Sequence, residues 1–166
     1  WNLSEPHAKL FDFVNYMFLG IGFLLGLTVA SVLAKTDFLV EKVVLSKEVN
    51  NRNPQGIFSP PAYCEKDKNG QAAIPVVQTS QTSQVVFWLK VEAITTGKLR
   101  HSWHHQTDGG WTKISEVNIP VRPSSGYRMW SMKSLRPHLH TGEWMIVVAP
   151  SSEPDRILCI TRFTVR

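Results

Sequence analysis

The stretch VVFWLKVEAI, residues 85–94, decides the fold class of this chain. Apolar side chains occupy every second position from Val85 to Ala93, whereas the charged residues Lys90 and Glu92 lie on the alternate positions. Because successive side chains of a strand point to opposite faces, this period of two predicts a half-buried β-strand. The core-facing side chains of that strand would be Val85, Phe87, Leu89, Val91 and Ala93.

Five similar segments follow, separated by turns rich in Gly, Pro, Ser and Asp. Their residues are 99–105, 111–121, 126–135, 142–149 and 156–165. Short strands at this spacing predict an all-β domain over residues 85–166, an antiparallel immunoglobulin-like β-sandwich. A small β-barrel is the alternative.

A long uncharged segment, residues 13–34, precedes this domain. At about 1.5 Å per residue, about 20 apolar residues cross a hydrocarbon layer of roughly 30 Å. The segment is therefore predicted to be a single transmembrane helix, preceded by an interfacial segment over residues 1–12. A cleaved signal peptide is the competing interpretation, but its apolar core would usually be shorter, about 7–15 residues.

One face of the predicted helix carries small residues at every fourth position: Gly22, Gly26, Ala30 and Ala34. Such a stripe lets two helix backbones approach closely, so these residues are predicted to pack against a partner helix or a second copy. Residues 13–34 contain no His, Asp, Glu, Lys or Arg, and an ion or proton path would normally need one of these residues.

Residues 35–84 are predicted to form an extended linker. Its first part, TDFLVEKVVLSKEV at residues 36–49, fits either a short helix or a strand. Four cations follow the span against one before it, a bias that would place the domain in the cytoplasm. Long domains cross membranes largely regardless of this bias, and we expect the domain on the periplasmic side of a bacterial inner membrane.

Two cysteines, Cys64 and Cys159, lie far apart in the sequence. In an oxidising periplasm they could form a disulfide that ties the linker to the domain. The alternative is a buried free thiol at Cys159.

Three motifs in the last half of the chain resemble a known family. They are His-x-Trp at His101 and Trp103, Arg-x-Trp-Ser at Arg128, Trp130 and Ser131, and Gly-x-Trp ending at Trp144. Together they resemble the bacterial domain-of-unknown-function family 2914, although the insertion-like RPHLH before the last motif departs from its pattern. The resemblance implies a membrane-tethered envelope domain and no known activity.

The histidines are weak candidates for a metal site: His101, His105, His138 and His140. Converging imidazoles would suit zinc or copper, but neither a neighbouring carboxylate nor Cys-x-x-Cys supports them. We predict no cofactor. Common catalytic motifs, including Gly-x-Ser-x-Gly, His-Glu-x-x-His and the phosphate loop, do not occur in the sequence, so we expect no enzyme.

Trp88 falls on the outward face of its strand and is the best single candidate for a partner contact. Arg128 is expected to act structurally, by stacking on an indole or pairing with a carboxylate. The net charge of +5 favours lipid headgroups or an acidic protein surface. The positive charges are diffuse and no nucleic-acid motif accompanies them.

These observations lead to the hypothesis of a non-catalytic accessory subunit of a bacterial inner-membrane complex, assembled through its helix and its β-domain. An energy-transducing complex, photosynthetic or respiratory, is the expected host. The alternative is a free-standing envelope module that binds a glycan or peptide.

Overall fold

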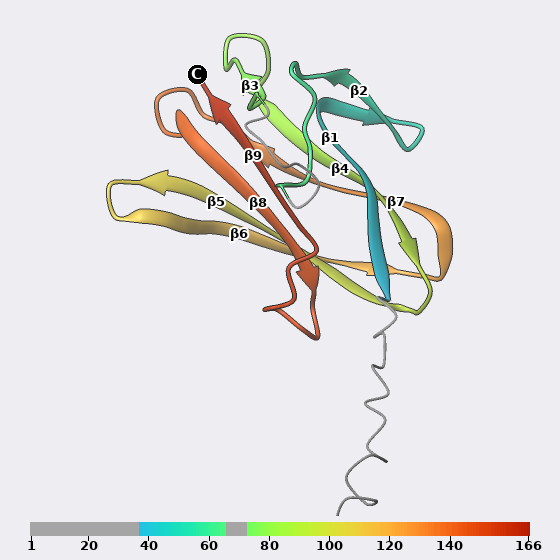
Figure 1. Cartoon of the computed structure of the whole chain (residues 1–166). Helices are drawn as coiled ribbons and strands as arrows, with labels where there is room; N and C mark the ends of the chain where they lie inside the picture. The colour runs from blue at the N-terminus through green and yellow to red at the C-terminus, as the bar shows by residue number, and fades with distance from the viewer. Residues whose placement is uncertain (1–36, 66–72) are drawn as a thin grey trace, which may run out of the picture. The chain divides into compact units, whose positions relative to one another are not determined.

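The computed structural model describes residues 37–65 and 73–166, and this part of the chain is an all-β unit (Figure 1). The strands are β1 (Phe38–Asn50), β2 (Asn53–Ile57), β3 (Val76–Val77), β4 (Gln84–Ala93), β5 (Gly97–Thr107), β6 (Gly110–Val121), β7 (Ser124–Ser134), β8 (Gly142–Pro150) and β9 (Cys159–Val165).

The predictions for residues 1–34 lie outside the described residues. They include the interfacial segment, the transmembrane helix over 13–34 and its stripe of small residues, Gly22, Gly26, Ala30 and Ala34. Within residues 37–65 and 73–166, no helix has the length and apolar character needed to cross a membrane.

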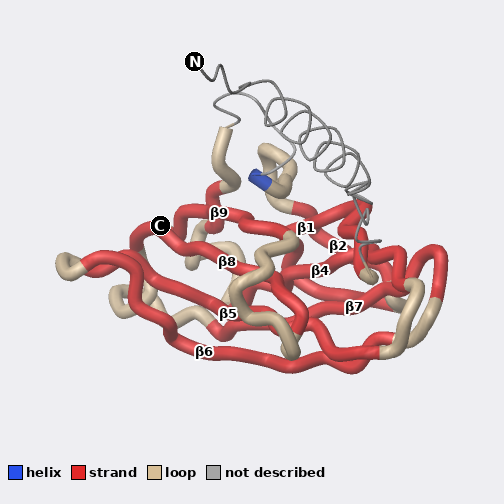
Figure 2. Tube along the Cα trace, turned by 60° about the horizontal axis from the view of Figure 1, so that its bottom comes forward, coloured by secondary structure: helices blue, strands red, loops and turns tan. Residues whose placement is uncertain are grey.

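The strands form two separate sheets that face each other (Figure 2). Sheet A has the order β2-β1-β4-β7, and sheet B has the order β3-β9-β8-β5-β6. All neighbours pair antiparallel except the short parallel pair of β3 and β9. The predicted β-sandwich is confirmed at this level, and the barrel alternative is wrong because the described strands make two sheets.

The core lies between the sheets and depends on β4. The five side chains predicted to face inward from β4 are all buried. Trp103, Trp144 and Phe163 of sheet B are completely buried opposite them and pack with their rings 6.1–6.3 Å apart. Each large apolar side chain that leaves water stabilises the fold by about 1.5–3 kcal/mol.

The sandwich begins well before Val85, inside the predicted linker. β1 pairs with β4 from Phe38 to Ser46, so it belongs to sheet A. A β-bulge between Val40 and Lys42 shifts the register, so the core-facing positions change from Phe38 and the half-buried Val40 to Val43 and Leu45. This shift interrupts the period of two, which is why the local pattern did not distinguish strand from helix.

A tight turn joins β1 to β2. Asn51 and Arg52 have φ of 47° and 64°, and Asn50 pairs with Asn53 across them. Two left-handed residues between paired strands are typical of the two-residue hairpin turn that suits the twist of antiparallel strands. The hairpin bends over the outer face of sheet A, because Gln84 Nε2 donates to Lys47 O at 3.0 Å and Trp88 Nε1 donates to Arg52 O at 3.0 Å.

A disulfide joins Cys64 to Cys159, with 5.1 Å between the Cα atoms. Beside it, Thr161 Oγ1 donates to the Tyr63 carbonyl at 3.0 Å. These contacts attach the segment after β2 to β9, so they connect the two sheets covalently across 95 residues of sequence.

We expect the Cys64→Ala/Cys159→Ala variant to lose about 2–5 kcal/mol of unfolding free energy, because the cross-link restricts a long loop in the unfolded chain. Urea unfolding followed by circular dichroism measures the loss. Reduction of the wild-type chain should lower its stability by a similar amount, and an unchanged midpoint after complete reduction would contradict the prediction.

Candidate functional site

A buried polar cluster crosses the core between the two sheets. Ser131 of β7 lies 2.9 Å through its Oγ from His101 Nδ1 of β5. The same oxygen accepts a hydrogen bond from Trp103 Nε1 at 3.1 Å. All three side chains are buried. The family motif residues His101, Trp103 and Ser131 therefore meet in space, although they come from different sheets.

The serine–histidine pair has the spacing of a nucleophile and its base, but its surroundings oppose catalysis. No ion pair or hydrogen bond of the described residues brings a carboxylate to His101. Burial lowers the pKa of His101 to about 3, so the imidazole is neutral and a poor base at neutral pH. We assign the cluster to the packing of the core.

The four candidate metal ligands do not converge. His101 lies in the core, and His105 lies four residues further along β5. Four residues of a strand span about 13 Å, so the two histidines are too far apart to share a metal ion. His105 Nε2 is 2.9 Å from the Thr141 carbonyl, and its ring stacks on Trp144. Within the described part of the chain, no three His, Cys, Asp or Glu side chains lie close enough to hold a metal ion.

The other two histidines lie in the loop between β7 and β8. His140 Nδ1 accepts a hydrogen bond from the Arg136 backbone N–H at 2.9 Å, and its ring meets that of Trp144 edge-on. Burial, followed by the charge of Lys133, lowers the pKa of His140. His138 occupies a turn with φ of 67°. Trp144 is buried between these groups and donates from Nε1 to the His140 carbonyl at 2.8 Å.

Trp88 faces outward from sheet A as predicted, opposite Trp130 of β7. Only 5% of its surface is exposed, because the β1–β2 hairpin covers it and its indole N–H is bound to Arg52 O. Trp88, predicted to contact a partner, therefore contacts the chain's own β1–β2 hairpin, and little of its surface is left for a partner.

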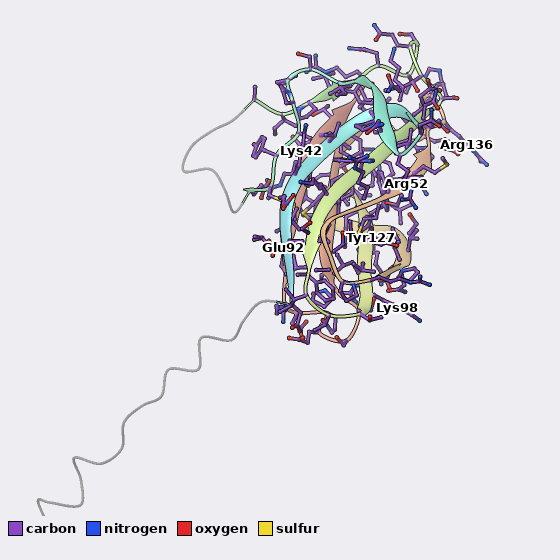
Figure 3. All side chains as sticks on the ribbon, turned by 90° about the vertical axis from the view of Figure 1, so that its right-hand side faces the viewer. Lys42, Arg52, Glu92, Lys98, Tyr127 and Arg136 are labelled. Atoms are coloured by element: carbon purple, nitrogen blue, oxygen red, sulfur yellow. A yellow bond between two sulfur atoms is a disulfide. The ribbon has the colours of Figure 1, made fainter. Side chains whose placement is uncertain are left out.

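The exposed side chains on this side of sheet A gather along β7. Trp130 and Met132 are 38% and 54% exposed, and Arg52 reaches the same region from the hairpin turn. Figure 3 shows Arg52 and Tyr127 on one side of β4, with Lys42 on the other. We call this surface the Arg–Trp face. It consists of Arg52, Arg128, Trp130 and Met132; Tyr127 lines the adjoining hollows but packs partly against the core.

Two adjoining hollows, of about 240 and 190 Å³, open on the Arg–Trp face. Both are lined by Arg52, Tyr127 and Arg128. The first also reaches Ser124, and the second reaches Trp130. A guanidinium group offers a planar set of donors that matches a carboxylate, and aromatic rings add apolar contact area. The hollows therefore suit small anionic groups with an adjacent apolar part.

The two guanidinium groups of this face are not neutralised by carboxylates in the described part of the chain, since no ion pair there includes either of them. Arg128 Nη1 donates to Asn53 Oδ1 at 3.3 Å, a neutral partner. The expected carboxylate or indole partner of Arg128 is thus replaced by an amide. The described cation–π contact belongs to Arg162 and Trp111, 5.7 Å apart.

A third hollow, of about 360 Å³, lies on the outer face of sheet B, and three of its charged residues, Arg100, Lys113 and Glu116, already contact one another. Glu116 Oε2 accepts from Lys113 Nζ at 3.1 Å and from Ser102 Oγ at 3.3 Å, and Arg100 Nε lies 3.9 Å away. The hydrogen bond from Lys113 lowers the pKa of Glu116. Burial and the charges of Lys113 and Arg100 lower the pKa of His104. A ligand would have to displace these contacts.

The comparison with protein families concerns the second half of the chain. Residues 96–165 match the family described as Protein of unknown function (DUF2914). The resemblance expected from the motifs is confirmed over these residues, which we call the DUF2914 segment. No curated protein matches the chain. The structure is similar to the crystal structure of a Niemann-Pick type C2 protein from Japanese carpenter ant, at a TM-score of 0.45 and 7% identity over 78% of this chain and 92% of that chain.

The DUF2914 segment contains strands β5 to β9, so it makes nearly all of sheet B and only one strand of sheet A. The Arg–Trp face combines β7 of this segment with Arg52, which lies outside it. No sequence pattern indicated Arg52, because its position near Arg128 depends on the hairpin that bends over β4.

The stability of the domain should fall in acid because of His101. An unfolded histidine has a pKa of about 6.5 and gains a proton below it, whereas folded His101 stays neutral down to pH of about 3. Between pH 7 and 5 the wild-type chain should lose about 2 kcal/mol of unfolding free energy through this residue.

In the His101→Gln variant this part of the pH dependence should disappear, since an amide can bind Ser131 but does not titrate. Urea unfolding at pH 7 and pH 5 measures the change in unfolding free energy for the wild type and for His101→Gln. The control is His104→Gln, at a less buried site. Equal slopes for wild type and His101→Gln would refute the assignment.

Proposed function

We propose that the chain is a non-catalytic accessory subunit of a bacterial inner-membrane complex, and that its sandwich docks on an acidic surface of a partner subunit through the Arg–Trp face. Residues 13–34 would anchor it through the stripe of small residues. The observation that carries the proposal is the pair of un-neutralised guanidinium groups beside an exposed tryptophan. Arg, Trp and Tyr are the residue types that most often dominate binding energy at interfaces.

Two further features support this proposal. The serine–histidine pair is enclosed in the core, which favours a binding role over a catalytic one. The disulfide is compatible with a location outside the cytoplasm, in an oxidising compartment. The domain would then lie on the periplasmic side.

We also propose that the sandwich is immunoglobulin-like. In that fold the second and fifth strands pair in one sheet, while the third, sixth and seventh are neighbours in the other. The pair β4–β7 and the neighbours β5-β8-β9 follow this arrangement if β1, β4, β5, β7, β8 and β9 are taken as the first, second, third, fifth, sixth and seventh strands. In this assignment β6 is an added strand beside β5, β2 and β3 are extra short strands, and no described strand takes the fourth place.

A second candidate function is a free-standing envelope module that binds a glycan or peptide. Trp130 favours it, because an exposed indole beside a hollow offers a flat apolar surface on which a sugar ring could stack. The partner, in that case, would be a small ligand in the hollows and not a protein surface.

The test is gentle solubilisation of native membranes, followed by native electrophoresis and mass spectrometry of the band that contains the chain. We expect the wild-type chain to migrate with a large complex at fixed stoichiometry. The Arg52→Glu/Arg128→Glu variant should leave more than nine-tenths of the chain outside that complex, since reversed charges would face acidic groups.

The control is Arg136→Glu/Arg166→Glu, which makes the same charge change at exposed positions away from the Arg–Trp face. It should migrate as the wild type. A wild-type chain that migrates alone would refute the accessory role. A complex that tolerates the double reversal at Arg52 and Arg128 would refute docking through this face.

A further inference from the structure

β1 is paired unequally along its two edges. Its pairing with β4 covers Phe38–Ser46, but β2 pairs only with Ser46–Asn50. From Phe38 to Val44, no described strand pairs with the second edge. An open edge presents the N–H and C=O groups of alternate residues to any chain that lies beside it.

A groove of about 410 Å³ follows this open edge. It is lined by five consecutive residues of β1, Val40–Val44, and by Ile57 and the segment Pro61–Cys64. Since alternate side chains of a strand point to opposite faces, consecutive residues can share a groove only at the edge of the strand. The accessible part of this edge is Val40–Lys42, since Glu41 and Lys42 are exposed and Val40 is half-buried, whereas Val43 and Val44 are buried. Most side chains that line the groove are apolar.

The opposite wall of the groove is held in place at both ends. Phe58 is buried, and its backbone N–H donates to Leu45 O at 3.0 Å. Cys64 is joined to Cys159 of β9. Between them, Pro60 and Pro61 have no N–H to donate, so this wall is poorly suited to pair with β1 itself.

The charges along this edge indicate what kind of chain would fit. Glu41 is already bound by Lys90, with 2.6 Å between Oε2 and Nζ. Lys42 is exposed, and no ion pair of the described residues includes it. The positive charge available at the groove therefore favours an acidic side chain on the incoming strand.

We propose that the open edge of β1 binds an extended segment of a partner protein with alternating apolar and acidic residues, which adds to sheet A as a further strand. Backbone hydrogen bonds would supply affinity, and the groove would select the side chains. In sheet A the order is β2-β1-β4-β7, so β1 and β4 lie between this open edge and β7. The site is thus separate from the Arg–Trp face, and either proposal can fail alone.

The test is fluorescence anisotropy with the full chain and a labelled seven-residue peptide of alternating Val and Glu. We expect saturable binding. The same peptide with every backbone nitrogen methylated keeps its side chains but cannot donate backbone hydrogen bonds, so it should bind at least tenfold more weakly. Equal binding of the two peptides, or no binding of either, would overturn the proposal.

Two variants locate the site. Lys42→Glu should weaken binding of the Val–Glu peptide at least tenfold and improve binding of a Val–Lys peptide, whereas Lys98→Glu on β5 should change neither. Ala62→Phe should fill the groove and abolish binding while the circular dichroism spectrum is kept. Binding that survives Ala62→Phe would overturn the site, as would a sedimentation result showing that the edge is closed by a second copy.

Discussion

The hydrogen bonds that meet at Ser131 Oγ constrain how the two sheets face each other. A buried polar group is costly without a partner, and His101 Nδ1 and Trp103 Nε1 of sheet B find one on β7 of sheet A, whereas His101 Nε2 has none among the described residues. Any slip of β5 or β7 by one residue would turn these side chains toward solvent and leave the others unpaired. Apolar packing around them, from Phe87 and Phe163, is directionless by comparison. The polar cluster therefore supplies the specificity of the core.

Much of the sandwich could be predicted from alternation alone. The five core-facing residues of β4 recur at every second position and are all buried, although Val86 and Trp88 on the other face are buried as well. β1 could not be predicted in the same way, because the bulge after Val40 breaks the period. The prediction that Trp88 lies on the outer face of its strand was correct. The β1–β2 hairpin that covers Trp88 could not be predicted from any local sequence pattern. Long-range contacts of this kind are decided by tertiary packing, which propensity and periodicity do not encode.

The Arg–Trp face also could not be predicted from local sequence patterns. Arg128 and Trp130 belong to the motifs that resemble the DUF2914 family. The residues of these motifs have two different roles, one in the core and one on the surface. His101, Trp103, Ser131 and Trp144 are buried and hold the core together. Arg128 and Trp130 lie on the outside of the same sandwich, where both keep exposed surface for contacts. A shared sequence motif thus combines structural and surface residues that only the fold separates.

The disulfide also has a mechanical consequence. A force applied through the chain before Asp37 would act first on β1, whose ladder with β4 could open one pair after another from Phe38. The unravelling could pass through β2 but would stop at Cys64, because that residue is bonded to Cys159 in the last strand. Sheet B and the rest of sheet A would then carry the load through a covalent link. A domain pulled in this way would yield over a defined extension, with loss of Phe38, Val43 and Leu45 from the core, and the disulfide would limit further extension from this end.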